Sequence, residues 1–149
     1  MTSIQEYINI TTKDVKHINC GGCGFFAKYF GEKLSDLGFN VKYIILTHDK
    51  KCVSEIKKYT KEDDTLGVLY SSWTHILLLV NNKYYVDAKG INKNLKEVNQ
   101  RDKMNRYAVE INEKILTNML KPDYVLRWNS VFDRVNCLKK LIKNIKTIK

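Results

Sequence analysis

The stretch THILLLVNNKYYVDA, residues 74–88, decides the fold class of this chain. Two runs rich in apolar, β-branched and aromatic residues, THILLLV and YYVDA, flank the turn-forming sequence NNK. This pattern predicts a β-hairpin that turns through Asn81 and Asn82. Since a hairpin belongs to an antiparallel sheet, the segments on either side of it must supply further strands and the helices that cover them.

Helical patterns lie on both sides of the hairpin. After Gly24 the apolar residues recur at helical spacing as far as Leu37, and Gly38 is suited to end that helix. From about Asn92 onward helical patterns dominate, most clearly at 125–148. This order predicts an α+β domain. Weaker patterns predict a helix or strand at 4–10, a strand at 41–47, an amphipathic helix at 52–59 and a strand at 65–70.

Length and composition limit the number of domains and the kinds of partner that the chain can have. Its 149 residues fit one domain, 1–149, and a chain of this size buries a real core without metal or disulfide staples. The net charge of +10 favours association with nucleic acid, acidic proteins or anionic membrane surfaces. Lysine and asparagine are abundant throughout, so the charge alone argues only weakly for nucleic-acid binding, which is disfavoured but left open.

No targeting or membrane-spanning segment is visible in the sequence. The first residues show neither the basic nor the apolar region of a signal peptide, and the longest strongly apolar run, 76–80, is far shorter than a membrane span. We therefore expect a cytoplasmic protein with reduced thiols, no cofactor and no membrane span.

The closely spaced Cys20 and Cys23, in the sequence CGGC, fit three chemistries. With His48 and Cys52 they would form a tetrahedral zinc site, although the spacing matches no usual zinc signature. As a dithiol at the start of a helix they suit redox chemistry, although no buried strand leads into them. In the third case one thiol is a nucleophile at a helix N-terminus.

The nucleophile hypothesis gathers the strongest elements of the sequence. A thiol at the start of a helix feels the positive end of the helix dipole, and the glycines at 22 and 24 let a substrate approach closely. Such a thiol needs a histidine base and a group that orients the base. His75 begins one strand of the hairpin and Asp87 lies on the other. Cys23, His75 and Asp87 are therefore the predicted catalytic residues, with Gly22 and Gly24 at the substrate.

The hairpin register decides whether this triad is possible, because side chains alternate along a strand. If the turn holds only Asn81 and Asn82, Asp87 faces Ile76 and points away from His75. If the loop holds residues 81–83, or if a β-bulge intervenes, Asp87 shares the face of His75. The triad hypothesis therefore predicts an odd-numbered loop or a bulge.

The same motifs resemble a known superfamily. CGGCGFFA resembles the nucleophile segment of papain-like cysteine peptidases, in which the second cysteine opens the central helix. THILLLVNNKYYVDAKG is similar to the His-to-Asp hairpin of the transglutaminase-like and arylamine N-acetyltransferase branches. The resemblance covers roughly 17–90. It implies a papain-like α+β fold and thiol-dependent hydrolysis or acyl transfer at a peptide, isopeptide or amide bond, through a thioester.

The resemblance also implies an oxyanion hole, and the chain departs from the family pattern at two positions in this region. His17 stands where the papain branch has a glutamine, and Asn19 is a rival for the same role beside the backbone amide of Cys23. Gly24 follows the nucleophile where an aromatic residue is usual. Trp73, just before the hairpin, is a candidate wall of the substrate cleft, or simply a core or rim aromatic.

The end of the chain is basic and amphipathic. Residues 139–149 carry five lysines and no acid, beside an apolar stripe. We expect the stripe to pack on the domain; the alternative is a helix that binds an acidic partner or a membrane surface. For the whole chain, the alternatives to a cysteine-dependent enzyme acting on a protein or peptide are a non-catalytic binding protein with a basic surface and a small zinc module.

Overall fold

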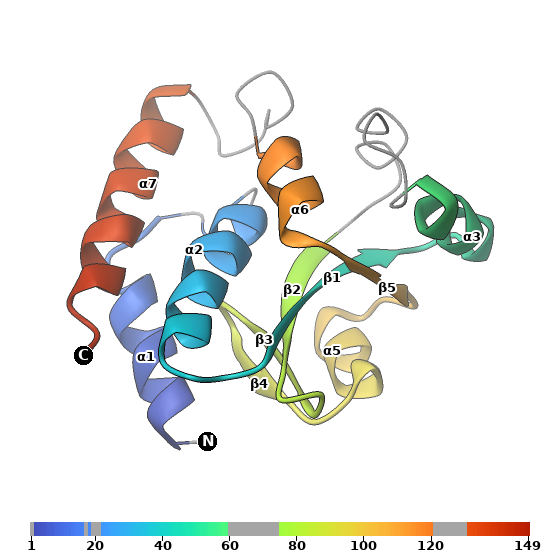
Figure 1. Cartoon of the computed structure of the whole chain (residues 1–149), viewed down its shortest axis with the longest axis horizontal. Helices are drawn as coiled ribbons and strands as arrows, with labels where there is room; N and C mark the ends of the chain where they lie inside the picture. Colours follow the sequence, from blue (N-terminus) through green and yellow to red (C-terminus); the bar gives the residue numbers. More distant parts are fainter. Residues whose placement is uncertain (1, 17, 19–21, 60–74, 121–130) are drawn as a thin grey trace.

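The computed structural model describes residues 2–16, 18, 22–59, 75–120 and 131–149, and these form an antiparallel sheet with helices on both faces (Figure 1). The elements in chain order are α1 (Thr2–Thr12), α2 (Cys23–Asp36), β1 (Val41–Thr47), α3 (Lys50–Tyr59), β2 (His75–Val80), β3 (Tyr84–Asp87), β4 (Gly90–Asn92), α5 (Leu95–Asp102), β5 (Tyr107–Ile111), α6 (Glu113–Met119) and α7 (Val131–Lys146). The α+β class is confirmed.

The sheet has five strands in the order β4-β3-β2-β1-β5, and each strand is antiparallel to its neighbours. β2 and β3 are the predicted hairpin, and β1 is the strand predicted at 41–47. Helices dominate after about Asn92 as predicted, but the strand β5 was not predicted; in it Val109 and Ile111 are buried while Glu110 is exposed. This two-residue alternation belongs to a strand with one face on the core. The segment at 4–10 is helical.

Two apolar layers enclose the sheet. Ile45, Ile76 and Leu78 lie in the larger core, with buried residues of α1, α2 and α7, and Figure 1 shows these three helices together on that side. Leu46 and Leu77 face the other way and pack with Val98 of α5. Because the sheet is covered on both faces, most residues of β1 and β2 are buried, in agreement with their nearly unbroken apolar sequence.

Helix α2 runs against the larger core and ends as predicted. Phe26 and Phe30 stack on one another with their ring centroids 4.8 Å apart, and both are buried. Gly38 has a φ of +97°, and the amides of Gly38 and Phe39 donate to the carbonyls of Ser35 and Leu34. This is the Schellman arrangement, which needs a left-handed residue and therefore favours glycine. Cys23 lies at the opposite end of α2, as its first residue.

Helix α7 packs on the domain through its apolar stripe, as expected. Leu141, Ile145 and Ile148 are buried, and the side-chain amide of Asn144 donates to backbone carbonyls at the end of α1. An acidic partner for the exposed lysines of this helix stays a prediction. Within the described ranges, no helix is both long and apolar enough to span a membrane. The strand predicted at 65–70 and the start of the helix predicted at 125–148 lie outside the described residues.

Candidate active site

Cys23 is the first residue of α2, and its thiol is free and buried. Gly22 precedes it as the N-cap and has no side chain to occupy the first amides of the helix. The backbone amides of Gly24 and Ile76 both donate toward the sulfur. The thiol therefore lies where α2 begins and where β2 begins, with the positive end of the helix dipole behind it.

His75 and Asp87 meet beside this thiol. His75 is the first residue of β2 and Asp87 is the last residue of β3. The Nε2 atom of His75 lies 2.9 Å from Oδ2 of Asp87, and the two residues are 8% and 1% exposed. Since Nε2 is engaged by Asp87, the Nδ1 atom is the ring nitrogen left for Cys23.

The register of the hairpin explains the contact. Val80 pairs with Tyr84 and Leu78 pairs with Val86, so the loop holds three residues, 81–83. Asn81 and Asn82 both have a φ of +54°, and the turn closes through a 3.1 Å hydrogen bond from the Lys83 amide to the Val80 carbonyl. The extra residue places Asp87 opposite Leu77 and on the face of His75. The odd-numbered loop that the triad hypothesis requires is present.

Each carboxylate oxygen of Asp87 has two hydrogen-bond partners. Its Oδ1 atom accepts from the Lys89 amide and from Nη1 of Arg101, both at 2.9 Å. Its Oδ2 atom accepts from His75 and, at 2.6 Å, from Nη2 of Arg101. Arg101 thus grips both carboxylate oxygens in the bidentate geometry that is strongest for this pair.

The sequence analysis missed Arg101. It lies on α5, three residues after Val98, which is the buried residue of that helix. Positions three apart on a helix share a face, so Arg101 had to point toward the sheet as Val98 does. That spacing was the available signal, but nothing in the sequence indicated which strand the helix covers.

The protonation equilibria of the three residues are linked. Burial raises the pKa of Cys23, but the hydrogen bond and the charge of His75 outweigh it, so this pKa lies below its ordinary value. Burial acts against the imidazolium, yet hydrogen bonds to Asp87 and Cys23 raise the pKa of His75 to about 9. Burial also acts against the Asp87 carboxylate, while His75 and Arg101 lower its pKa to about 2. All three directions favour a thiolate–imidazolium pair next to an ionised carboxylate.

The remaining predicted site residues are placed only in part. His17, Asn19, Cys20 and Trp73 lie outside the described residues, so the oxyanion hole, the dithiol and the cleft wall stay predictions. Gly24 is buried, and a Cβ atom there would lie 2.7 Å from Cδ2 of Leu120 and 3.3 Å from Cδ1 of Ile76. Close packing therefore explains this glycine by itself, and its contact with substrate is a prediction.

Three of the four ligands of the zinc alternative, Cys23, His48 and Cys52, lie within the described residues, and these three do not assemble. In the described part of the chain, no three histidine, cysteine or acidic side chains gather as metal ligands. His48 is exposed, with Nδ1 3.4 Å from the Asn105 carbonyl, while Cys52 lies on α3 and Cys23 contacts His75. The structure thus corrects the proposed grouping of Cys23, His48 and Cys52.

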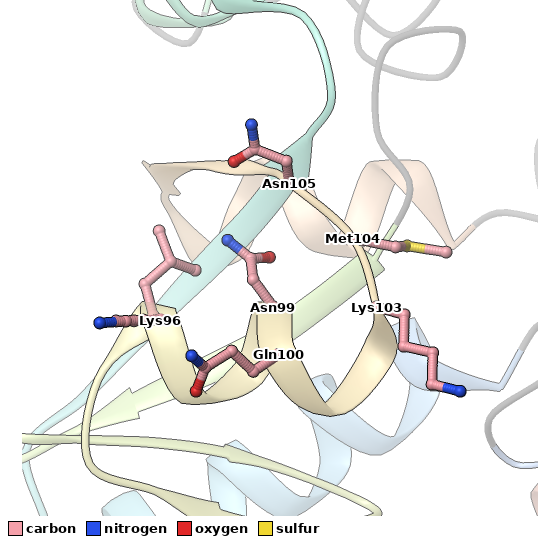
Figure 2. Close-up of a pocket in the computed structure, with 7 residues that line it drawn as sticks. Lys96, Asn99, Gln100, Lys103, Met104 and Asn105 are labelled. Atoms are coloured by element: carbon pink, nitrogen blue, oxygen red, sulfur yellow. The ribbon is translucent and has the colours of Figure 1, made fainter.

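A shallow groove elsewhere on the surface has no catalytic residues. It runs along the outer side of α5 and the segment that follows, and Figure 2 shows its lining of Lys96, Asn99, Gln100, Lys103, Met104 and Asn105. The lining offers amides and lysines but no nucleophile, and Asn99 is already hydrogen-bonded to the buried Arg106, so this groove is ordinary surface rather than a second candidate active site.

Comparisons of the chain with protein-family models, with curated proteins and with solved structures return no match. What the site does must therefore be argued from its own residues.

Proposed function

We propose that this protein is a cysteine-dependent hydrolase or acyltransferase that acts on a peptide, isopeptide or amide bond of a protein or peptide substrate in the cytoplasm. The observation that carries the proposal is the buried His75–Asp87 hydrogen bond of 2.9 Å, next to a thiol whose pKa is lowered by the same histidine. Nucleophile, base and orienting group stand in the order that thiol catalysis needs, on an arrangement resembling the papain-like superfamily.

The reaction begins from the thiolate–imidazolium pair, in which Nδ1 of His75 holds the proton of Cys23. The thiolate, stabilised by the N-terminus of α2, attacks the substrate carbonyl and forms a C–S bond, while the carbonyl oxygen becomes an oxyanion. The Cys23 amide, together with His17 or Asn19, holds this oxyanion. The imidazolium then protonates the leaving amine as the C–N bond breaks, and a thioester remains.

The second half of the reaction releases the acyl group. Water or an acceptor amine loses a proton to His75 and attacks the thioester, and the C–S bond breaks to restore Cys23. Asp87 keeps the proton of His75 on Nε2 when the ring is neutral and balances its charge when the ring is protonated. In both halves of the reaction Nδ1 of His75 exchanges a proton while Nε2 stays bonded to Asp87. The imidazole ring must therefore keep a fixed orientation.

The test is the pH dependence of Cys23 alkylation. The folded protein is treated with iodoacetamide between pH 4 and 9, and modified cysteines are mapped by mass spectrometry. His75→Ala removes the base, and His48→Ala is the matched control because His48 is exposed and its ring bonds only a backbone carbonyl at 3.4 Å among the described contacts.

An ordinary thiol has a pKa of about 8.5, and we expect Cys23 to react with an apparent pKa well below that value. His75→Ala should remove this effect, and His48→Ala should keep it. A Cys23 that stays silent, or titrates as an ordinary thiol in the wild type, would refute the enzyme and favour the non-catalytic binding protein.

A further inference from the structure

The candidate active site continues beyond Asp87 as a row of alternating charges. Arg101 contacts Asp87 on one side and Asp102 on the other, where its Nε and Nη2 atoms lie 2.9 and 3.1 Å from the two carboxylate oxygens. Asp102 in turn accepts from Arg106 at 2.6 Å and from Lys89 at 3.1 Å. The row thus passes from Cys23 through the hairpin into α5.

Charge balance gives Arg101 a specific place in this row. The reactive form of the triad holds a thiolate, an imidazolium and a carboxylate, which together carry one negative charge in a buried setting. An uncompensated buried charge is costly. Unless a counter-charge is present, such a site takes up one proton, becomes neutral and loses its reactive form. Arg101 is the counter-charge that touches Asp87, and Arg106 and Lys89 balance Asp102 instead.

We propose that Arg101 is a positioning residue of the catalytic triad, which keeps Asp87 ionised and oriented toward His75 and thereby holds Cys23 in its reactive form. The inference rests on the proposed function. Arg101 touches neither the thiol nor the imidazole in the described contacts, and acts through Asp87 alone. Arg101 donates a hydrogen bond to each oxygen of Asp87, so the carboxylate cannot rotate away from His75 without breaking two charge-assisted hydrogen bonds.

The consequence of losing Arg101 has a definite sign. Without it, burial makes Asp87 take up a proton at higher pH, and the protonated acid no longer supports the imidazolium. Because the imidazolium is what stabilises the thiolate, the acid limb of the Cys23 alkylation profile moves to higher pH. For a displacement of about one pH unit, the rate on that limb falls about tenfold.

The experiment compares Arg101→Met with Lys89→Met. Lys89→Met is the matched control, because it removes one positive charge from the same network while the Lys89 backbone amide still donates to Asp87. Alkylation of Cys23 is measured across pH for the full chain, after circular dichroism has shown that each variant is folded. Asp87→Asn and the double variant Asp87→Asn, Arg101→Met complete a double-mutant cycle.

We expect Arg101→Met to shift the acid limb upward, Lys89→Met to leave it in place, and Arg101→Met to add nothing in the Asp87→Asn background. If Arg101→Met and Lys89→Met give the same profile as the wild type, Arg101 is structural and the inference is wrong, while the proposed function stands. If the wild-type profile is that of an ordinary thiol, the proposed function fails and this inference fails with it.

Folding of the variants is also decisive. Should Arg101→Met fail to fold while the double variant folds, the uncompensated Asp87 carboxylate is the cause, and the action of Arg101 through Asp87 is supported. Should neither fold, Arg101 serves the packing of α5 whatever the state of Asp87, and the inference is overturned.

Discussion

His75 and Asp87 are bonded diagonally across the β2–β3 hairpin, with 2.9 Å between Nε2 and Oδ2, because three residues rather than two connect their strands. A strand presents successive side chains to opposite faces, so the contact between the histidine and the carboxylate requires that Lys83 belong to the loop and not to β3. The geometry of the site thus depends on the place of Lys83, a residue that takes no part in its chemistry.

Deletion of Tyr85, within β3, should separate the pair. Tyr84 continues to pair with Val80, so Val86 moves opposite Leu79 and Asp87 moves opposite Leu78. Asp87 would then point into the larger core, and Val86, which is fully buried there, would turn to the opposite face. We expect the Cys23 alkylation profile to become that of an ordinary thiol and the melting temperature to fall.

The control is deletion of Lys83, which shortens the loop to Asn81 and Asn82 while Val80 and Tyr84 still flank it. These asparagines already have the positive φ angles of a two-residue type I′ turn, so Asp87 stays opposite Leu77 and both properties should be kept. A Tyr85 deletion variant that alkylates with the wild-type profile would show that register does not place Asp87.

NMR titration of His75 tests the linked protonation directly. With only three histidines in the chain, the His75 ring signals can be assigned by comparison with His75→Gln. We expect His75 to titrate near pH 9 in the wild type, because Asp87 and Cys23 stabilise its charged form. A midpoint at or below the ordinary value of about 6.5 would contradict the ion pair.

The raised pKa of His75 also makes stability depend on pH, and in the wild type Cys23 offsets this dependence. A raised pKa contributes stability that is fully present below about 6.5 and is lost as the pH rises through about 9. In the wild type the lowered pKa of Cys23 releases a proton on folding and offsets this loss. In Cys23→Ala, Asp87 alone raises the pKa of His75, so it is raised by less than in the wild type. We therefore expect the free energy of unfolding to fall as the pH rises above about 6.5 in Cys23→Ala and to stay nearly level there in the wild type, measured by urea unfolding.

Asp87 makes the opposite contribution in acid. Its pKa is lowered from 3.8 to about 2, so its stabilising effect is present above 3.8 and is lost as the pH falls through about 2. The loss amounts to about 2 kcal/mol. Urea unfolding between pH 2 and 5 should show this slope in the wild type and a shallower one in Asp87→Asn. Equal slopes would mean that Asp87 is not held ionised by its partners.

Gly31 reports on the packing that carries α2. A Cβ atom at this position would lie 2.9 Å from Cε1 of Tyr43 and 3.1 Å from Cδ2 of Leu78, and both side chains are buried. Overpacking of this kind costs about 1–3 kcal/mol, against which alanine gains about 1 kcal/mol in helix propensity. Gly31→Ala should therefore lower the free energy of unfolding by about 1 kcal/mol in urea, and an unchanged or higher value would show that α2 can move off the sheet.

The sequence by itself determined those features that depend on neighbouring residues. The hairpin, the strand at 41–47 and the helix that ends at Gly38 follow from local periodicity and turn chemistry, and each is present. The candidate nucleophile, base and acid were also visible, because Cys23 precedes a helix and His75 and Asp87 lie at the ends of a hairpin. The alternation of side chains along a strand even set the loop length that the triad requires.

Only the tertiary structure decided what depends on distant segments. The pairing of β5 with β1, the choice of the three-residue loop and the approach of α2 to the start of β2 result from burying two apolar faces at once. The grip of Arg101 on Asp87 follows from the packing of Val98 against that second face, since the burial of one turn of α5 carries the guanidinium to the carboxylate. Local sequence patterns specify which face of a helix is apolar, but the partner of that face is selected by the packing of the whole domain.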